Sequence, residues 1–217
     1  MMQWFPVKLS NLLERIGQDR SGLALIEFAM SLPVFLTLAL GGMELANLSS
    51  AHMRVSQIAM TVADNAGRVD PSIDEADIYE IFAGASLIGE KLDFEANGRV
   101  ILSSLQHNGL SGTDEGQMIN WQRCMGDLTV ASLYGAEGTG RTDNSLPIGM
   151  GPTGNEIFSA PGTAIMFVEV VYDYQQLIPG KLFNKEIRYE TAFNVRSRSI
   201  LDITNSSSPA LAVKTCA

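Results

Sequence analysis

Hydrophobic residues form one continuous run near the start of the chain, and the later apolar segments are periodic. Residues 23–43 read LALIEFAMSLPVFLTLALGGM and contain a single formally charged side chain, that of Glu27. About 21 helical residues span close to 30 Å, which is the thickness of the hydrocarbon core of a bilayer. The run therefore predicts a transmembrane helix over residues 23–44, and Pro33 within it predicts a kink.

The apolar positions after Glu44 recur at alternating spacings of three and four residues, which is the period of an amphipathic helix. This stripe consists of Leu45, Leu48, His52, Val55, Ala59, Val62, Ala66 and Val69. It predicts that the transmembrane helix continues out of the membrane with one apolar face. That face packs either on a sheet of the same chain or on helices of neighbouring subunits, and the pattern leaves both open.

A second helix is predicted after Asp70-Pro71, because proline ends a helix and Ser72 with Glu75 forms a capping-box pattern. Its buried face is predicted at Ile78, Ile81, Phe82, Ala85 and Ile88, and its end at Gly89. The acidic side chains of its first turn complement the helix dipole and lack the spacing of an EF-hand loop. We therefore expect no calcium site there.

From residue 99 onward the apolar positions take the period of strands. The predicted strands are residues 100–105, 118–124, 164–174 and 187–196. Residues 135–162 contain seven glycines and three prolines, which predicts a long irregular segment. The last two strands are joined by about a dozen residues that include Pro179-Gly180, which suits an antiparallel pair.

Together these elements predict an α+β fold in which the long N-terminal helix packs on a mainly antiparallel sheet of about four strands. The strand face that carries Ile187, Tyr189, Phe193 and Val195 is predicted to cover the helical stripe. The opposite face of the same strand, which carries Arg188, is predicted to face solvent.

Composition and charge narrow the classes of function. The formal net charge of the 217-residue chain is −9, and its 15 Lys and Arg residues are scattered, which argues against a nucleic-acid partner. The two cysteines, Cys124 and Cys216, are compatible with one disulfide if the domain lies outside the cytoplasm. Two free buried thiols are the alternative.

Residues 1–22 precede the apolar run and carry Lys8, Arg15 and Arg20. Positively charged residues that flank a transmembrane helix stay in the cytoplasm. The residues after the helix are therefore predicted to lie on the other side of the membrane. No A-x-A-type site follows the apolar run, so the segment is not an ordinary secretory signal peptide. A carboxylate such as Glu27 costs on the order of 3 kcal/mol inside a membrane, so it needs a partner, a role or a hydrated position near the interface.

The stretch Gly22-Leu23-Ala24-Leu25-Ile26-Glu27 resembles the processing site of type IV prepilins, in which a peptidase cuts after a Gly and a Glu lies five residues into the mature chain. Its continuation through Phe28 to Pro33 is similar to the TadE-like branch of tight-adherence (Tad or Flp) pilus assembly proteins. Pro33 lies earlier in the run than the usual proline of type IV pilins. Three short motifs in the C-terminal part are also similar to segments of TadE-like proteins: Trp121-Gln122-Arg123, Glu169-Val170-Val171-Tyr172-Asp173-Tyr174 and Arg196-Ser197-Arg198.

This resemblance implies a pilin-like minor pilin or pseudopilin that takes part in assembling a tight-adherence type IV pilus. It implies a cytoplasmic leader over residues 1–22, a cut between Gly22 and Leu23, and an assembly role for Glu27 and Phe28. The implied partners are a prepilin peptidase, other pilins or pseudopilins and the inner-membrane assembly platform. The protein would span the bacterial inner membrane once, with residues 45–217 in the periplasm.

Two alternatives remain open beside this reading. The peptidase itself can be what recognises Glu27, in which case the carboxylate has no role after the cut. The protein can also be a permanently anchored periplasmic binding or adhesion protein that uses residues 135–162 as its contact surface.

Catalytic and metal-binding patterns have little support. The sequence contains no G-x-S-x-G, H-E-x-x-H or C-x-x-C motif, and His52 and His107 lack metal-binding spacing. Glu169 and Asp173 share one face of a predicted strand, and we expect them to lie on its solvated side. The sequence thus predicts a non-enzymatic protein without a metal or cofactor.

Overall fold

A computed structural model of the chain describes residues 21–178 and 185–216. The predicted leader therefore lies outside the described residues except for its last two positions, and so does Pro179-Gly180 in the predicted strand connection. The chain separates into two compact units, Met1–Ala46 and Asn47–Ala217, which are described in turn.

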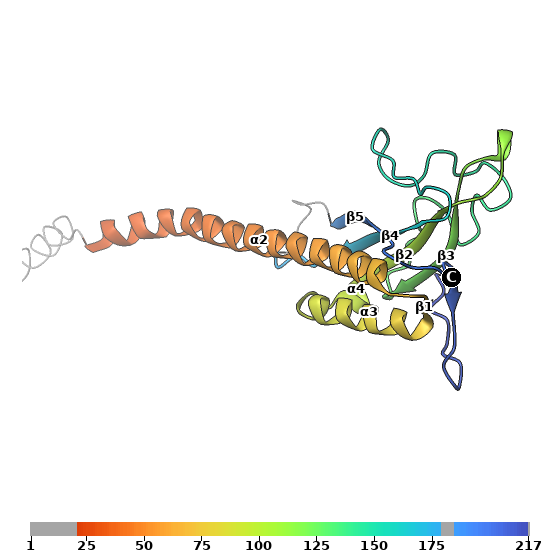
Figure 1. Ribbon diagram of the computed structural model, residues 1–217. Coiled ribbons are helices and arrows are strands. Elements are labelled where there is room, and N and C mark those ends of the chain that lie inside the picture. The colour runs from red at the N-terminus through yellow and green to blue at the C-terminus, as the bar shows by residue number, and fades with distance from the viewer. Residues whose placement is uncertain (1–20, 179–184, 217) are drawn as a thin grey trace, which may run out of the picture. The chain divides into compact units, whose positions relative to one another are not determined.

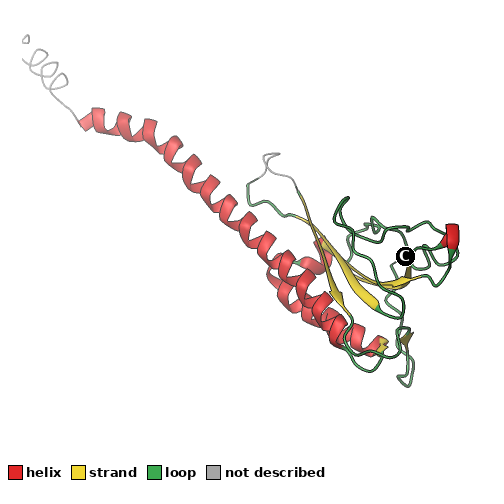
Figure 2. Ribbon diagram, turned by 45° about the horizontal axis from the view of Figure 1, so that its top comes forward, coloured by secondary structure: helices red, strands yellow, loops and turns green. Residues whose placement is uncertain are grey.

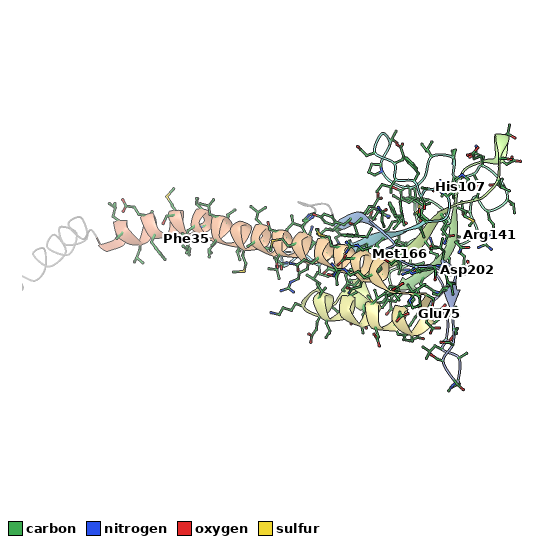
Figure 3. The ribbon with its side chains drawn as sticks, viewed as in Figure 1. Phe35, Glu75, His107, Arg141, Met166 and Asp202 are labelled. Carbon is green, nitrogen blue, oxygen red and sulfur yellow. A yellow bond between two sulfur atoms is a disulfide. The ribbon has the colours of Figure 1, made fainter. Side chains whose placement is uncertain are left out.

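The first unit contains the beginning of helix α2, which spans Ser21–Arg68 and continues through Pro33. The Thr37 hydroxyl donates a hydrogen bond of 2.7 Å to the Pro33 carbonyl one turn earlier. Apolar side chains such as Phe35, 67% exposed, project outward from this part of the helix (Figure 3). The helix is long and apolar enough to cross a membrane, and its apolar part is not buried in the protein. It therefore fits a single-pass membrane anchor.

The second unit, which we call the head, begins with the remainder of α2. The middle of its apolar stripe, from Val55 to Ala66, is buried, and Val55, Val62 and Ala66 are fully enclosed. His52 is half-buried and lies edge-on to Tyr189, with ring centroids 5.9 Å apart. Of the two partners that the stripe left open, the sheet of the same chain is the one it contacts in the head.

A four-stranded antiparallel sheet forms the centre of the head, with the strand order β3-β2-β4-β5 (Figure 1). The strands are β2 (Gly98–His107), β3 (Gln117–Met125), β4 (Ala164–Asp173) and β5 (Glu186–Asn194). Met166 of β4 is fully buried in the core that the sheet shares with the helices (Figure 3). The predicted α+β class, with a long N-terminal helix and four strands, is confirmed.

Helix α3 (Glu75–Gly89) begins two residues later than the sequence predicted. Asp74, not Ser72, is its N-cap, and Asp74 forms the capping box with Asp77. The reason is a long-range pairing: strand β1 (Ile73–Asp74) pairs in parallel with β6 (Ile203–Thr204) and keeps the chain extended up to the cap. The predicted end at Gly89 is confirmed. Two short helices, η1 (Glu90–Leu92) and α4 (Phe94–Asn97), connect α3 to β2.

The second face of the sheet is also covered, so the prediction that it faces solvent is wrong. The helices lie on one side of the sheet and the connection between β3 and β4 lies on the other (Figure 2). This connection supplies Leu146 and Met150 to a second core with Ile165 and Phe167 of β4. On the helix side, Phe193 is partly rather than fully buried, because β5 is the outermost strand on its side of the sheet.

The end of the chain is fastened to β3. Cys216 forms a disulfide with Cys124, across a sequence separation of 92 residues. The Cys124 amide also donates a hydrogen bond of 2.8 Å to the Lys214 carbonyl. The predicted disulfide is therefore confirmed.

Candidate functional site

The residues with a predicted role in processing and assembly all lie on the first part of α2. Gly22, Leu23, Glu27, Phe28 and Pro33 are exposed there, with Leu23 and Phe28 63% and 61% accessible. Leu23 and Glu27 are four residues apart on one helix, so their side chains occupy the same face one turn apart.

The fold itself does not explain a glycine at position 22. A β-carbon added to Gly22 would meet nothing within 4 Å among the described residues, and its backbone is ordinary right-handed helix. Glycine in a helix costs about 1 kcal/mol relative to alanine. The benefit of Gly22 therefore has to come from something other than packing within the described protein.

The Trp121-Gln122-Arg123 motif fastens β3 to its surroundings. The Trp121 indole donates a hydrogen bond of 3.2 Å to the Leu201 carbonyl, and Gln122 bonds the Ser103 hydroxyl at 2.9 Å. The Arg123 guanidinium lies 2.7 Å from the Glu75 carboxylate. Glu75 is the first residue of α3 (Figure 3). Arg123 also lies 2.9 Å from Glu137, so it links a helix and a loop to one edge of the sheet.

The second motif acts in the same way on β4. The Tyr172 hydroxyl donates a hydrogen bond of 2.9 Å to the Leu92 carbonyl, and the Tyr174 hydroxyl accepts one of 2.8 Å from Asn47 of α2. Glu169 points to the opposite face of the sheet. The prediction that Glu169 lies on a solvated face is wrong, because its side chain is fully buried under the loop that contains Ser132.

Glu169 is the centre of a cluster that the sequence did not predict. Its carboxylate accepts hydrogen bonds from the Ser132 hydroxyl and the Leu133 amide, at 2.5 and 3.0 Å, and lies 3.4 Å from Arg188. Burial raises the pKa of the Glu169 carboxyl, and these donors offset part of the shift. Burial, followed by the hydrogen bond to Glu190, also raises the pKa of the Tyr134 phenol.

The sequence did contain a signal for this cluster. Residues 164–172 form a nearly continuous apolar run, which is typical of a strand buried on both faces. A carboxylate in the middle of such a run needs donors and a cation, which the loop and β5 supply. The arrangement holds the loop in place.

The third motif meets the end of α2. The buried Arg198 guanidinium donates hydrogen bonds to the Ala66 and Val69 carbonyls, where the helix leaves its last acceptors without partners. Burial lowers the pKa of this guanidinium. Arg196 is exposed and 4.0 Å from Asp64. The first two motifs thus connect strands of the sheet to other elements, and the third connects the segment after β5 to the end of α2.

Hollows on the head carry no recognisable catalytic arrangement among the described residues. One of about 390 Å³ lies beside the disulfide, between Ile101, Val130 and Cys216. Another of about 580 Å³ lies beside His107, whose Nε2 atom is 3.5 Å from Glu115. Within residues 21–178 and 185–216, no group of three or more His, Cys, Asp or Glu side chains is placed to hold a metal ion.

The chain combines an exposed apolar N-terminal helix, which fits a single-pass membrane anchor, with an α+β head. A protein-family model described as TadE-like protein matches residues 22–64. The resemblance predicted from the sequence is thus confirmed for this N-terminal segment, which is TadE-like and indicates a protein associated with the Tad pilus. That family is non-enzymatic in general. No curated protein and no solved structure gives a significant match.

Proposed function

We propose that the protein is a minor pilin or pseudopilin that takes part in assembling a tight-adherence type IV pilus, and thereby in adhesion and biofilm formation. The observation that carries this proposal is the position of the TadE-like match. It begins at Gly22, the residue before the proposed cut, and includes the exposed helical face shared by Leu23 and Glu27.

The proposed topology follows from the same segment. Residues 1–22 form a cytoplasmic leader, residues 23–44 cross the inner membrane, and residues 45–217 form a periplasmic head. The disulfide between Cys124 and Cys216 supports an oxidising compartment for the head. Prepilin peptidase, other pilins or pseudopilins and the inner-membrane assembly platform are the proposed partners.

In this proposal Gly22 and Glu27 act in sequence. A glycine before the cut lets the peptidase approach the backbone, which accounts for a residue that packing in the described protein does not require. The cut gives Leu23 a free α-amine, which is mostly protonated near neutral pH. Glu27 lies one helical turn away, and the two charges offset part of the cost of leaving water, within one subunit or between neighbours.

The test compares surface pili in the native host after chromosomal replacement with Gly22→Leu, Glu27→Gln and a control, Glu90→Gln. Glu90 is an exposed carboxylate in the head and has no role in the proposal. We expect both N-terminal variants to lose pili while the control keeps them. Normal piliation in Gly22→Leu and Glu27→Gln cells would refute the pilin proposal.

A second candidate function is a permanently anchored binding or adhesion protein. The observation that favours it is the exposure of Ile148 and Phe158, 58% and 69% accessible, beside the hollow near His107. Both side chains belong to the proposed contact segment, residues 135–162. This candidate predicts a mature protein that still begins at Met1.

A further inference from the structure

The two outer strands of the sheet, β3 and β5, differ in whether the backbone groups of their outer edges are hydrogen-bonded. The edge of β3 is paired with other parts of the chain: the Gln117 amide bonds the Leu146 carbonyl, and Ile119 exchanges hydrogen bonds with Thr139 and Gly138. The Gln122 amide donates a hydrogen bond to the Glu137 carboxylate. No extended segment can add to this edge without displacing these contacts.

The edge of β5 is open over most of its length. Register with β4 is regular, and the bonds Tyr174 N–H to Lys185 and Val195 N–H to Ala164 show that odd-numbered residues of β5 bond to β4. In an antiparallel pair the residues between them direct their N–H and C=O groups away from the partner strand. Among the described residues, these groups of Glu186, Arg188, Glu190 and Ala192 meet no backbone or side-chain partner.

The end of α2 covers the β5 edge at one end of this stretch. The Arg196 amide donates a hydrogen bond of 3.0 Å to the Gly67 carbonyl, and a β-carbon on Gly67 would lie 3.1 Å from the Asn194 carbonyl oxygen. The end of α2 thus lies against the edge at Asn194. The open stretch runs from Glu186 to Ala192. Every residue of the neighbouring inner strand up to Tyr172 is buried, whereas all but one residue of β5 remain partly or fully exposed.

Side chains beside the open edge specify what can occupy it. On the helix side, Tyr189 and Phe193 are partly buried apolar groups that a neighbouring strand would cover. On the other side, β5 carries the carboxylates of Glu186 and Glu190 but the single guanidinium of Arg188, which also lies 3.4 Å from the buried Glu169. Cross-strand pairs of opposite charge stabilise a sheet, so a fitting segment carries a basic residue in this row.

We propose that the β5 edge from Glu186 to Ala192 binds an extended segment of another protein by β-strand addition. The segment alternates apolar residues, on the side of Tyr189 and Phe193, with at least one Lys or Arg opposite Glu186 or Glu190. Main-chain hydrogen bonds hold it and the alternate side chains select it. This inference does not depend on cleavage after Gly22. Normal pili together with an unoccupied β5 edge would refute the strand-addition proposal and leave the pilin proposal standing.

The experiment places a photo-reactive phenylalanine analogue at Asn194 of the full chain in host membranes, with the same group at exposed Ala83 of α3 as the control. Mass spectrometry identifies the cross-linked residues. We expect residue 194 to cross-link to an alternating apolar and basic stretch of another protein, and residue 83 not to do so. A cross-link to a second copy of this chain, or none above the control, would overturn the proposal.

Two further variants test the mode of binding. Ala192→Pro removes only an outward N–H, which an edge strand tolerates, and should lower the cross-link yield at residue 194 about tenfold or more. Glu186→Lys should also lower the yield, whereas Glu80→Lys, at an exposed site on α3, should not. If Ala192→Pro does not fold, Glu186→Lys decides: an unchanged yield in this folded variant contradicts the proposed charge selection.

Discussion

Glu169 of β4 and Arg188 of β5 form a diagonal pair across neighbouring strands, with 3.4 Å between the carboxylate and the guanidinium. The Glu169 side chain is fully buried and the Arg188 side chain is 20% exposed. Glu169 also holds the loop at Ser132 and Leu133, so this pair joins the outer strand to the loop that covers the second face. Its integrity should affect both the stability of the head and the position of that loop.

Arg188→Ala should destabilise the head markedly, because it leaves the Glu169 carboxylate buried without its cation. We expect a loss of about 2–3 kcal/mol in the free energy of unfolding, below the range for a fully enclosed pair because Arg188 is partly solvated. Arg196→Ala is the control, because the Arg196 side chain is 62% exposed and its guanidinium lies as far as 4.0 Å from the Asp64 carboxylate. Equal unfolding midpoints in urea for the two variants would contradict the role of the pair.

The free energy of unfolding should rise with pH in the acid range where Asp74 titrates, and fall with pH in the higher range where Glu169 titrates. The amides of Ala76 and Ser206 lower the pKa of Asp74 from 3.8 to about 2, so its stabilisation is complete above the ordinary pKa and is lost as the pH falls toward 2. Burial raises the pKa of Glu169, so stability falls as the pH rises from the ordinary value of 4.5 through the raised one.

Urea unfolding measured across pH separates these two contributions. Asp74→Asn should flatten the acid limb and leave the other range unchanged, whereas Glu169→Gln should flatten only the range above 4.5. A Glu169→Gln profile that matches the wild type in that range would show that the carboxylate does not titrate differently in the folded head.

Removing the disulfide should lower the free energy of unfolding of the head, because the unfolded chain gains conformational freedom. A closed loop of roughly 90 residues contributes up to about 4–5 kcal/mol in a chain-entropy treatment, and often less in practice. Cys124→Ala with Cys216→Ala should therefore lower the urea midpoint, and a reductant should then have no further effect. If both thiols of the unreduced, unfolded wild type react with an alkylating reagent, the bond is not present in the protein.

Gly126 and Gly138 provide a matched pair of left-handed glycines. Their φ angles are 96° and 91°, so alanine is strained at either site. A β-carbon at Gly126 would also collide with the Gly98 carbonyl, whereas one at Gly138 meets nothing within 4 Å. Gly138→Ala should cost on the order of 1–2 kcal/mol and Gly126→Ala clearly more, by thermal unfolding. Equal losses of stability in the two variants would mean that the chain at Gly126, just after β3, can shift to accommodate the added β-carbon.

Local patterns predicted most of the elements, because they depend on neighbouring residues. The strand segments, the stripe on α2 and the buried face of α3 all followed from periodicity. The start of α3 did not, since the pairing of Ile73 with Ile203 holds the chain extended before the cap. A capping-box pattern contains no information about a strand 130 residues later.

The covered second face and the Glu169 cluster were missed for the same physical reason. Residues 135–162 lack a period, so the sequence predicts an irregular segment without saying where it packs. In the structure the segment supplies Leu146 and Met150 to a second core, and the loop before it reaches Glu169. The continuous apolar run of β4 is the one local signal of burial on both faces, whereas the alternation of β5 is typical of a strand with one solvated face.

The two N-terminal variants separate the proposed roles of Gly22 and Glu27. Gly22→Leu should leave a full-length, inserted precursor. Glu27→Gln keeps the size of the side chain and removes its charge, so cleavage should be largely retained while pilus assembly fails. If the peptidase itself reads Glu27, the Glu27→Gln protein accumulates uncut instead, and intact-mass measurement of membrane extracts distinguishes the two outcomes.

The most direct test of the account is the N-terminus of the wild-type protein isolated from the membranes of its host. Intact mass and N-terminal sequencing should give a mature chain that begins at Leu23, with the anchor retained and residues 1–22 removed. A chain that still begins at Met1 would contradict processing as a prepilin and would favour the permanently anchored binding protein.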